Sequence, residues 1–70
     1  MKIILEGELS SAASIDVSRI VRRVIGERPG YDVNVVVARP GRAPWSVFVS
    51  GLPEHPLAVA IQAELINARL

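Results

Sequence analysis

The apolar residues of segment 2–9 include three at every second or fourth position, which predicts a strand with one buried face. The apolar side of the predicted pleat is Ile3, Leu5 and Leu9. The other side carries Glu6 and Glu8 beside an isoleucine, so we expect it to be half solvated. Gly7 weakens this strand and predicts a bulge.

A helical period replaces the alternation after residue 9. Ser10, Ser11 and Ser14 are three candidate N-caps, because a serine hydroxyl accepts a hydrogen bond from a free backbone N–H. Apolar residues then recur at i, i+3, i+4, i+7 and i+8, and these are Val17, Ile20, Val21, Val24 and Ile25. The opposite face is polar and carries Asp16, Ser18, Arg19, Arg22 and Arg23. Gly26 is a typical residue after a helix end.

Residues 31–39 carry the strongest strand signal, and residues 45–50 carry a second one. The first of these segments is apolar on both faces, which is typical of a central or covered strand. One face is Tyr31, Val33, Val35 and Val37, and the other includes Val36 and Ala38. In the second segment, Trp45, Val47 and Val49 share one face. Arg39-Pro40-Gly41-Arg42 is typical of a type II turn, so the two segments form a predicted hairpin with residues 39–44 as its connection.

The last segment predicts a helix that begins at Pro56 and ends near Arg69, with apolar residues on two sides. At about 100° per residue, one apolar face is Leu57, Ile61, Leu65 and Ala68. The second apolar face lies on the opposite side and is Val59, Ala63, Ile66 and Leu70. One face can cover the sheet. The second is either a partner interface or a surface that packs on the first helix.

These elements predict a single α+β domain over residues 1–70, with the order β-α-β-β-α. This is a two-layer sandwich with a ferredoxin-like order that lacks the last strand. In that topology, as we predict it, the first and third strands are parallel neighbours and the second pairs antiparallel with the third. The first strand then has an open edge, which charges such as Lys2 and Glu6 can blunt or a second chain can pair with.

Composition narrows the possible functions. The chain has 70 residues, of which 50% are hydrophobic and 21% are charged, so it is globular but small. A core of this size supplies only about 3–5 kcal/mol, and small domains add disulfides, metals or a partner. There is no cysteine and one histidine, so self-association is the remaining route, and we expect no metal and no cofactor. The absence of cysteine fits a reducing compartment, and we expect a cytoplasmic protein.

The net charge of +1 argues against strong attraction of the whole surface to nucleic acid. No apolar run approaches the ~20 residues of a membrane span, and the beginning of the chain lacks the apolar stretch of a signal peptide, so no membrane partner is expected.

Catalytic chemistry is not indicated. His55 is the only conventional base near neutral pH, and its neighbour Glu54 would point about 100° away on a helix. No serine lies in a Gly-x-Ser-x-Gly elbow, and neither a phosphate-binding loop nor a His-Glu-x-x-His motif is present. We therefore predict no enzyme and no catalytic residues, and we interpret Pro-Glu-His-Pro as the start of the last helix.

A basic patch is the alternative candidate site. Its members are Arg19, Arg22, Arg23, Arg39 and Arg42, with Trp45 as a stacking platform for a base. Such a patch would bind phosphates of a nucleic acid or an acidic protein. The competing interpretation is a solvated helix face with Asp16 and Glu27 as counter-charges, and a tryptophan that packs over the edge of the sheet.

The opening of the chain, Met1 to Glu8 with a Ser/Ala-rich cap and an Ile/Val/Arg helix after it, resembles small uncharacterised proteins of actinobacteria and their phages. The resemblance covers about the first 25 residues, is compositional, and implies a phage or host accessory protein that acts by binding. From the residues we expect a non-enzymatic protein–protein interaction module. Its partner is a second copy, with a dimer favoured, or a host protein. The alternative is a small nucleic-acid-binding protein.

Overall fold

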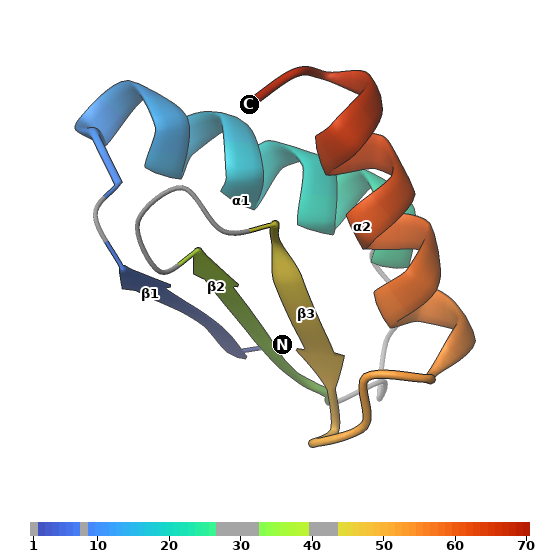
Figure 1. Ribbon diagram of the computed structural model, residues 1–70. Coiled ribbons are helices and arrows are strands. Elements are labelled where there is room, and N and C mark those ends of the chain that lie inside the picture. The colour runs from blue at the N-terminus through green and yellow to red at the C-terminus, as the bar shows by residue number, and fades with distance from the viewer. Residues whose placement is uncertain (1, 8, 27–32, 40–43) are drawn as a thin grey trace.

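The computed structural model describes residues 2–7, 9–26, 33–39 and 44–70. The elements in chain order are β1 (Lys2–Gly7), α1 (Ser11–Ile25), β2 (Asn34–Arg39), β3 (Ser46–Val49) and α2 (Pro56–Asn67). The predicted α+β fold and its β-α-β-β-α order are therefore confirmed. Figure 1 shows both helices on the same side of the sheet, so the fold has two layers.

The three strands form one mixed sheet in the order β1-β2-β3. β1 pairs parallel with β2, and β2 pairs antiparallel with β3. The hairpin and the open edge of β1 agree with the sequence-based expectation, but the predicted pairing of the first strand with the third is wrong. The physical reason lies in β2, which is apolar on both faces. Val35 and Val37 are buried and Val36 is half-buried, so β2 takes the central position, where neighbours cover both of its edges.

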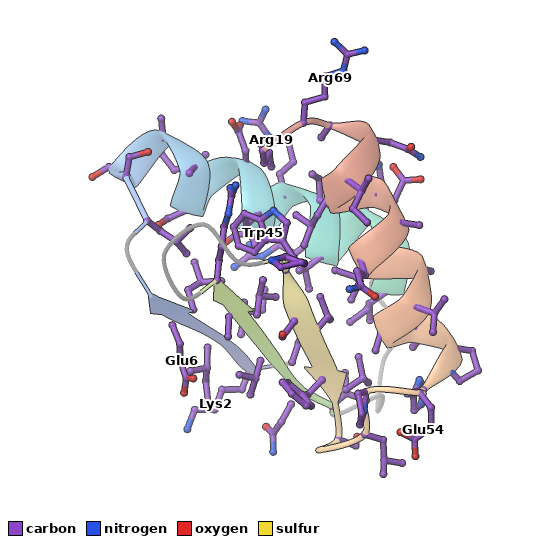
Figure 2. The ribbon with its side chains drawn as sticks, in the orientation of Figure 1. Lys2, Glu6, Arg19, Trp45, Glu54 and Arg69 are labelled. Atoms are coloured by element: carbon purple, nitrogen blue, oxygen red, sulfur yellow. The ribbon has the colours of Figure 1, made fainter. Side chains whose placement is uncertain are left out.

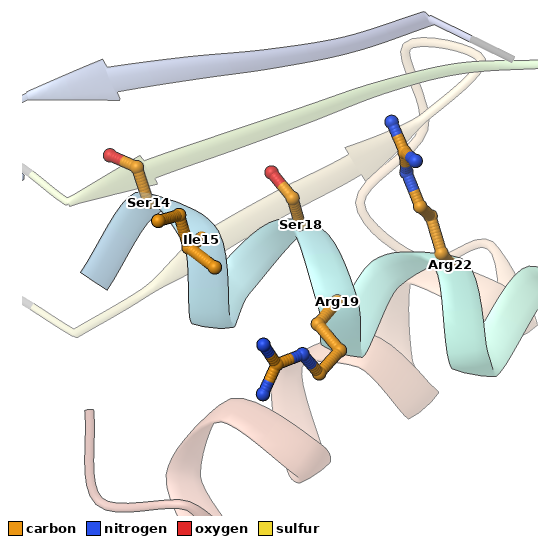
Figure 3. A pocket seen from close by; sticks show the side chains of 5 residues that line it. All are labelled: Ser14, Ile15, Ser18, Arg19 and Arg22. Carbon is orange, nitrogen blue, oxygen red and sulfur yellow. The ribbon is translucent and has the colours of Figure 1, made fainter. Parts of the chain in front are cut away.

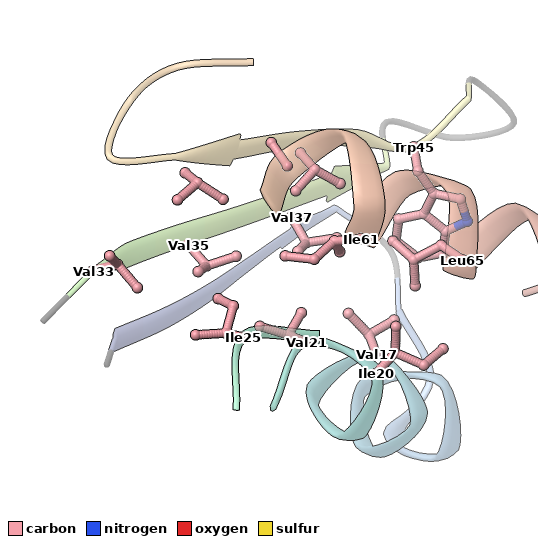
Figure 4. Packing of buried hydrophobic residues seen from close by; sticks show 13 residues of the cluster. Val17, Ile20, Val21, Ile25, Val33, Val35, Val37, Trp45, Ile61 and Leu65 are labelled. Carbon is pink, nitrogen blue, oxygen red and sulfur yellow. The ribbon is translucent and has the colours of Figure 1, made fainter. Parts of the chain in front are cut away.

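The core lies between the sheet and the two helices. It contains the α1 stripe that the helical period predicted, together with one face of β2 and β3 (Figure 4). The buried residues are Val17, Ile20, Val21, Ile25, Val33, Val35, Val37, Trp45, Val47, Val49, Ala58, Ile61 and Leu65. α2 contacts both α1 and β3, so it closes the core on the side of β3. α1 packs beside α2 on the same side of the sheet.

Local hydrogen bonds define the helix ends. The Ser10 side chain accepts a hydrogen bond from the Ala13 backbone N–H at 3.1 Å, which selects Ser10 among the three candidate caps. Gly26 has a φ of 73° and its N–H donates to the Arg22 carbonyl, so α1 ends there. α2 ends at Asn67, earlier than predicted, because Arg69 takes a left-handed φ of 56°.

Some sequence-based expectations concern residues outside the described part of the chain. These are the type II turn at residues 39–42, the position of Tyr31 at the start of the second strand, and the contribution of Arg42 to a basic patch.

Gly7 ends β1 in a conformation that other residues rarely adopt. Its φ is 103°, and a Cβ added there would collide with the carbonyl oxygen of Arg39. Gly7→Ala should therefore lower the free energy of unfolding by about 2–3 kcal/mol, measured by urea denaturation. Gly51→Ala is the matched control, since Gly51 also has a positive φ but has nothing within 4 Å of the added Cβ. That variant should lose only about 1 kcal/mol. Equal losses would show that the contact with Arg39 has no effect.

Candidate functional site

Trp45 is an anchor of the core and not an exposed platform. Only 5% of the residue is exposed, and its Nε1–H donates a hydrogen bond to the Leu70 carbonyl at 3.2 Å. The Gln62 side chain donates from Nε2 to the Trp45 carbonyl at 2.7 Å. The Arg39 guanidinium lies over the ring at 4.9 Å from its centroid. In Figure 2 the ring lies between the sheet and the helices. The interpretation of Trp45 as a base-stacking residue does not agree with this burial.

The predicted basic residues do not converge on one place. Arg23 is paired with Glu64 of α2 at 2.9 Å between Nη2 and Oε2, and both side chains are exposed. A surface pair of this kind contributes about 0–1 kcal/mol. Arg22 and Arg23 lie in the last turn of α1, whereas Arg39 ends β2 at the opposite end of the sheet. Arg39 is thus separated from the arginines at the end of α1, and Trp45 is buried, so the described members of the predicted patch do not form one surface around Trp45.

The one histidine has a structural role in this fold. Its Nδ1 accepts a hydrogen bond from the Leu57 backbone N–H at 3.1 Å, so His55 is the N-cap of α2, and Pro56 occupies the first helical position. Within residues 2–7, 9–26, 33–39 and 44–70, no three or more His, Cys, Asp or Glu side chains are placed to hold a metal ion.

The outer face of α2 is uncovered. Val59 is 53% exposed and Ile66 is 61% exposed, and Ala63 between them is exposed as well. The first apolar face provides the contacts to the sheet and to α1, since Ile61 and Leu65 are fully buried. The second face therefore does not pack on the first helix within this chain.

Two residues at the end of α2 depart from the predicted faces. Leu70, assigned to the second face, is half-buried against the core, and its carbonyl accepts the Trp45 hydrogen bond. Ala68, assigned to the face that covers the sheet, is exposed. The end of the helix at Asn67 explains both, because the residues after it no longer follow the helical period.

β1 forms an uncovered edge of the sheet. Its inward side chains, Ile3 and Leu5, pack against the core but are only half-buried, and its outward residues Lys2 and Glu6 are exposed. In the described part of the chain β1 has a strand neighbour on one side alone. Backbone N–H and C=O groups on the other side of β1 therefore have no ladder partner.

A groove lies along α1 with a volume of about 490 Å³, lined by Ser14, Ile15, Ser18, Arg19 and Arg22. Figure 3 shows Ser14, Ser18 and Arg22 directed from α1 toward the sheet, and Arg19 directed toward α2. A smaller cleft of about 260 Å³ lies between α1 and the end of α2. Its lining includes Asp16, Arg23 and Leu70. α2 thus covers one flank of α1, and the groove lies on the flank that carries Ser14 and Ser18.

The far face of the sheet carries an apolar row that the sequence alone did not reveal. Ile4 is level with Val36, and Val36 is level with Phe48, so one side chain from each strand lies in line across the sheet. All three are half-buried, although neither helix lies on this face. Only the register of the three strands shows that these residues are neighbours.

The fold and these surfaces define a small α+β domain with an open strand edge and an exposed helix face. The chain matches no protein-family model, no curated protein and no solved structure. Among the described residues, no helix combines the length and the apolar character needed to cross a bilayer.

Proposed function

We propose that this protein is a non-enzymatic protein–protein interaction module that self-associates as a dimer. The observation that supports the proposal best is the incomplete burial of β1. Its two inward apolar residues, Ile3 and Leu5, are half exposed beside an unpaired strand edge. Exposed strand edges pair readily with another chain unless they are blocked.

Energetics support the same proposal. A domain of 70 residues has a core that supplies about 3–5 kcal/mol. Burying a large apolar side chain adds about 1.5–3 kcal/mol. Covering even two half-exposed residues in each copy would therefore raise the free energy of unfolding by a large fraction of what the core supplies. Association couples to folding, because a partner that binds only the folded chain stabilises it by mass action.

The outer face of α2, formed by Val59, Ala63 and Ile66, then serves as a second contact surface. We assign it to the binding of a cellular protein. Neighbouring exposed apolar side chains of this kind are typical of protein contact sites. The basic residues support the nucleic-acid alternative less well, since Arg23 is paired and Trp45 is buried.

The test of self-association is the mass in solution. The chain has a mass of 7.6 kDa, so sedimentation equilibrium at tens of micromolar should give about twice that value. The thermal midpoint should also rise with protein concentration, as expected for a dimer that unfolds to monomers. A mass of one chain over this range, with a midpoint independent of concentration, would show that the proposed self-association is wrong.

A further inference from the structure

We propose that two copies join by antiparallel pairing of β1 with β1, in a register centred on Ile4, to make one continuous six-stranded sheet. This inference rests on the proposed self-association and names the surface and the register that produce it. The occupant of the edge is a second copy of this chain.

The direction of the backbone groups limits the registers. The Lys2 N–H donates to the Val33 carbonyl at 3.0 Å, so the backbone of Lys2 faces β2. Since backbone groups in a strand alternate in direction, Ile4 and Glu6 face β2 as well. Ile3, Leu5 and Gly7 therefore direct their N–H and C=O groups to the free edge. In an antiparallel pair of two identical strands, a two-fold axis passes through the centre of the ladder. The residues that face the free edge have odd numbers and must pair with one another, so this axis passes through a residue and not through a peptide bond.

Charge order selects one of the remaining registers. With Ile4 on the axis, Lys2 lies opposite Glu6 of the second copy, and Ile4 lies opposite Ile4. With Ile3 on the axis, Lys2 would face Ile4. With Leu5 on the axis, Ile4 would face Glu6. Within β1 only the Ile4-centred register pairs opposite charges and apolar side chains at once, and it does so twice by symmetry.

The same register places the bonding pairs where the edge is apolar. Ile3 lies opposite Leu5, and each such pair exchanges two backbone hydrogen bonds, which gives about four across the axis. Ile3 and Leu5 are directed to the helix layer, where both are half-buried against the core. Ile4 faces Ile4 between these two bonded pairs, and a Lys2–Glu6 pair flanks them on each side; all three are non-hydrogen-bonded pairs, in which opposite side chains come closest. The ladder thus buries the apolar residues that one chain leaves half exposed.

The groove beside α1 makes room for the helix of the second copy. α2 occupies one flank of α1, through the pair of Arg23 with Glu64, so the flank with Ser14 and Ser18 is the one that faces away from α2. α2 lies over β3, at the other side of the sheet from β1. Serines allow a close approach of two helices. Ile15, which lines the same groove and is 59% exposed, gains cover from the partner.

The outer face of α2 fits a second copy less well. Its large apolar residues within the helix are Val59 and Ile66 alone, because Leu70 is directed into the core. Two side chains on each copy are a small contact for a stable dimer. The residues of that face, Val59, Ala63 and Ile66, are all uncharged, so they offer no charge pairing like that of Lys2 with Glu6 in β1.

Charge inversion at β1 tests the register. Lys2→Glu should place a glutamate opposite Glu6, and Glu6→Lys should place a lysine opposite Lys2, each at two symmetric sites. Each single variant should raise the dimer dissociation constant by roughly 10- to 100-fold, measured by sedimentation. The double variant Lys2→Glu with Glu6→Lys restores opposite charges and should return to within about threefold of the original protein. Both residues are exposed, so circular dichroism should remain unchanged.

The outer face of α2 and the β1 amides give two further measurements. The Val59→Ser and Ile66→Ser double variant should keep the mass of the dimer. Hydrogen exchange at the Ile3 and Leu5 amides should be slow in the dimer and fast in a dissociated single variant. If the original protein is a monomer, the proposed self-association fails and this inference with it. If it is a dimer whose mass is insensitive to both single inversions, or one that the α2 variant dissociates, only the β1 register is overturned.

Discussion

Replacing Ile61 with alanine should remove most of the stability of the domain. Ile61 is 0% exposed and lies on the face of α2 that covers the core, between α1 and β3 (Figure 4). A buried isoleucine truncated to alanine loses about 2–5 kcal/mol, which combines the lost transfer free energy with the cavity that remains. A core of this size supplies about 3–5 kcal/mol in total. We therefore expect a variant that is largely unfolded at 37 °C.

Ile66→Ala is the matched control for this prediction. It is the same substitution in the same helix, but Ile66 is 61% exposed on the outer face of α2. Its free energy of unfolding should change by less than about 0.5 kcal/mol. Urea denaturation of both variants, followed by circular dichroism at low protein concentration, measures the difference. Similar losses for the two variants would contradict the assignment of the inner and outer faces of α2.

The first helix was predictable because its period is simple. Val17, Val21 and Ile25 recur at helical spacing with arginines opposite, and no other element matches that pattern, so the stripe and its buried face follow from the sequence. The last helix was only partly predictable. Its period places apolar residues on two sides, and nothing local states which side the sheet covers. Only the packing of α2 against α1 and β3 decides between them.

The sheet order shows a different limit of sequence reasoning. The order of elements matched a ferredoxin-like unit, and that match suggested the wrong neighbour for β1. The stronger signal was present in Val35, Val36 and Val37, which make both faces of β2 apolar and thus indicate a central strand. Pairing depends on contacts between residues far apart in the chain. The sequence of one strand indicates its place in the sheet only when the apolar character of both of its faces is considered, as in β2.

The role of Trp45 could not be read from its neighbours in the sequence. Beside Arg39 and Pro44 it is consistent with a nucleic-acid contact or with a residue that packs on the sheet. Its actual partners, Gln62 and Leu70, come from the other end of the chain. The structure therefore assigns Trp45 of the hairpin to the core and not to a binding surface. The candidate at β1 became sharper, because the pairing with β2 shows which edge of β1 is left without a neighbouring strand.

Trp45→Ala should lower the free energy of unfolding by about 3–5 kcal/mol, which makes it the second of the two largest effects expected here. The ring is buried, and its N–H fixes the end of the chain through the Leu70 carbonyl. Trp45→Phe keeps most of the apolar area but removes this hydrogen bond, and it should lose about 1–2 kcal/mol. The two variants together separate the contribution of packing from that of the hydrogen bond.

Phe48→Ala provides the comparison that completes this test. Phe48 is also an aromatic residue near the hairpin, but it is half-buried on the far face of the sheet, which the helices do not cover. Its truncation should therefore cost clearly less than that of Trp45, and urea denaturation followed by circular dichroism measures both. If Trp45→Ala were the milder of the two, Trp45 would not be an anchor of the core. The base-stacking interpretation of the hairpin would then regain support.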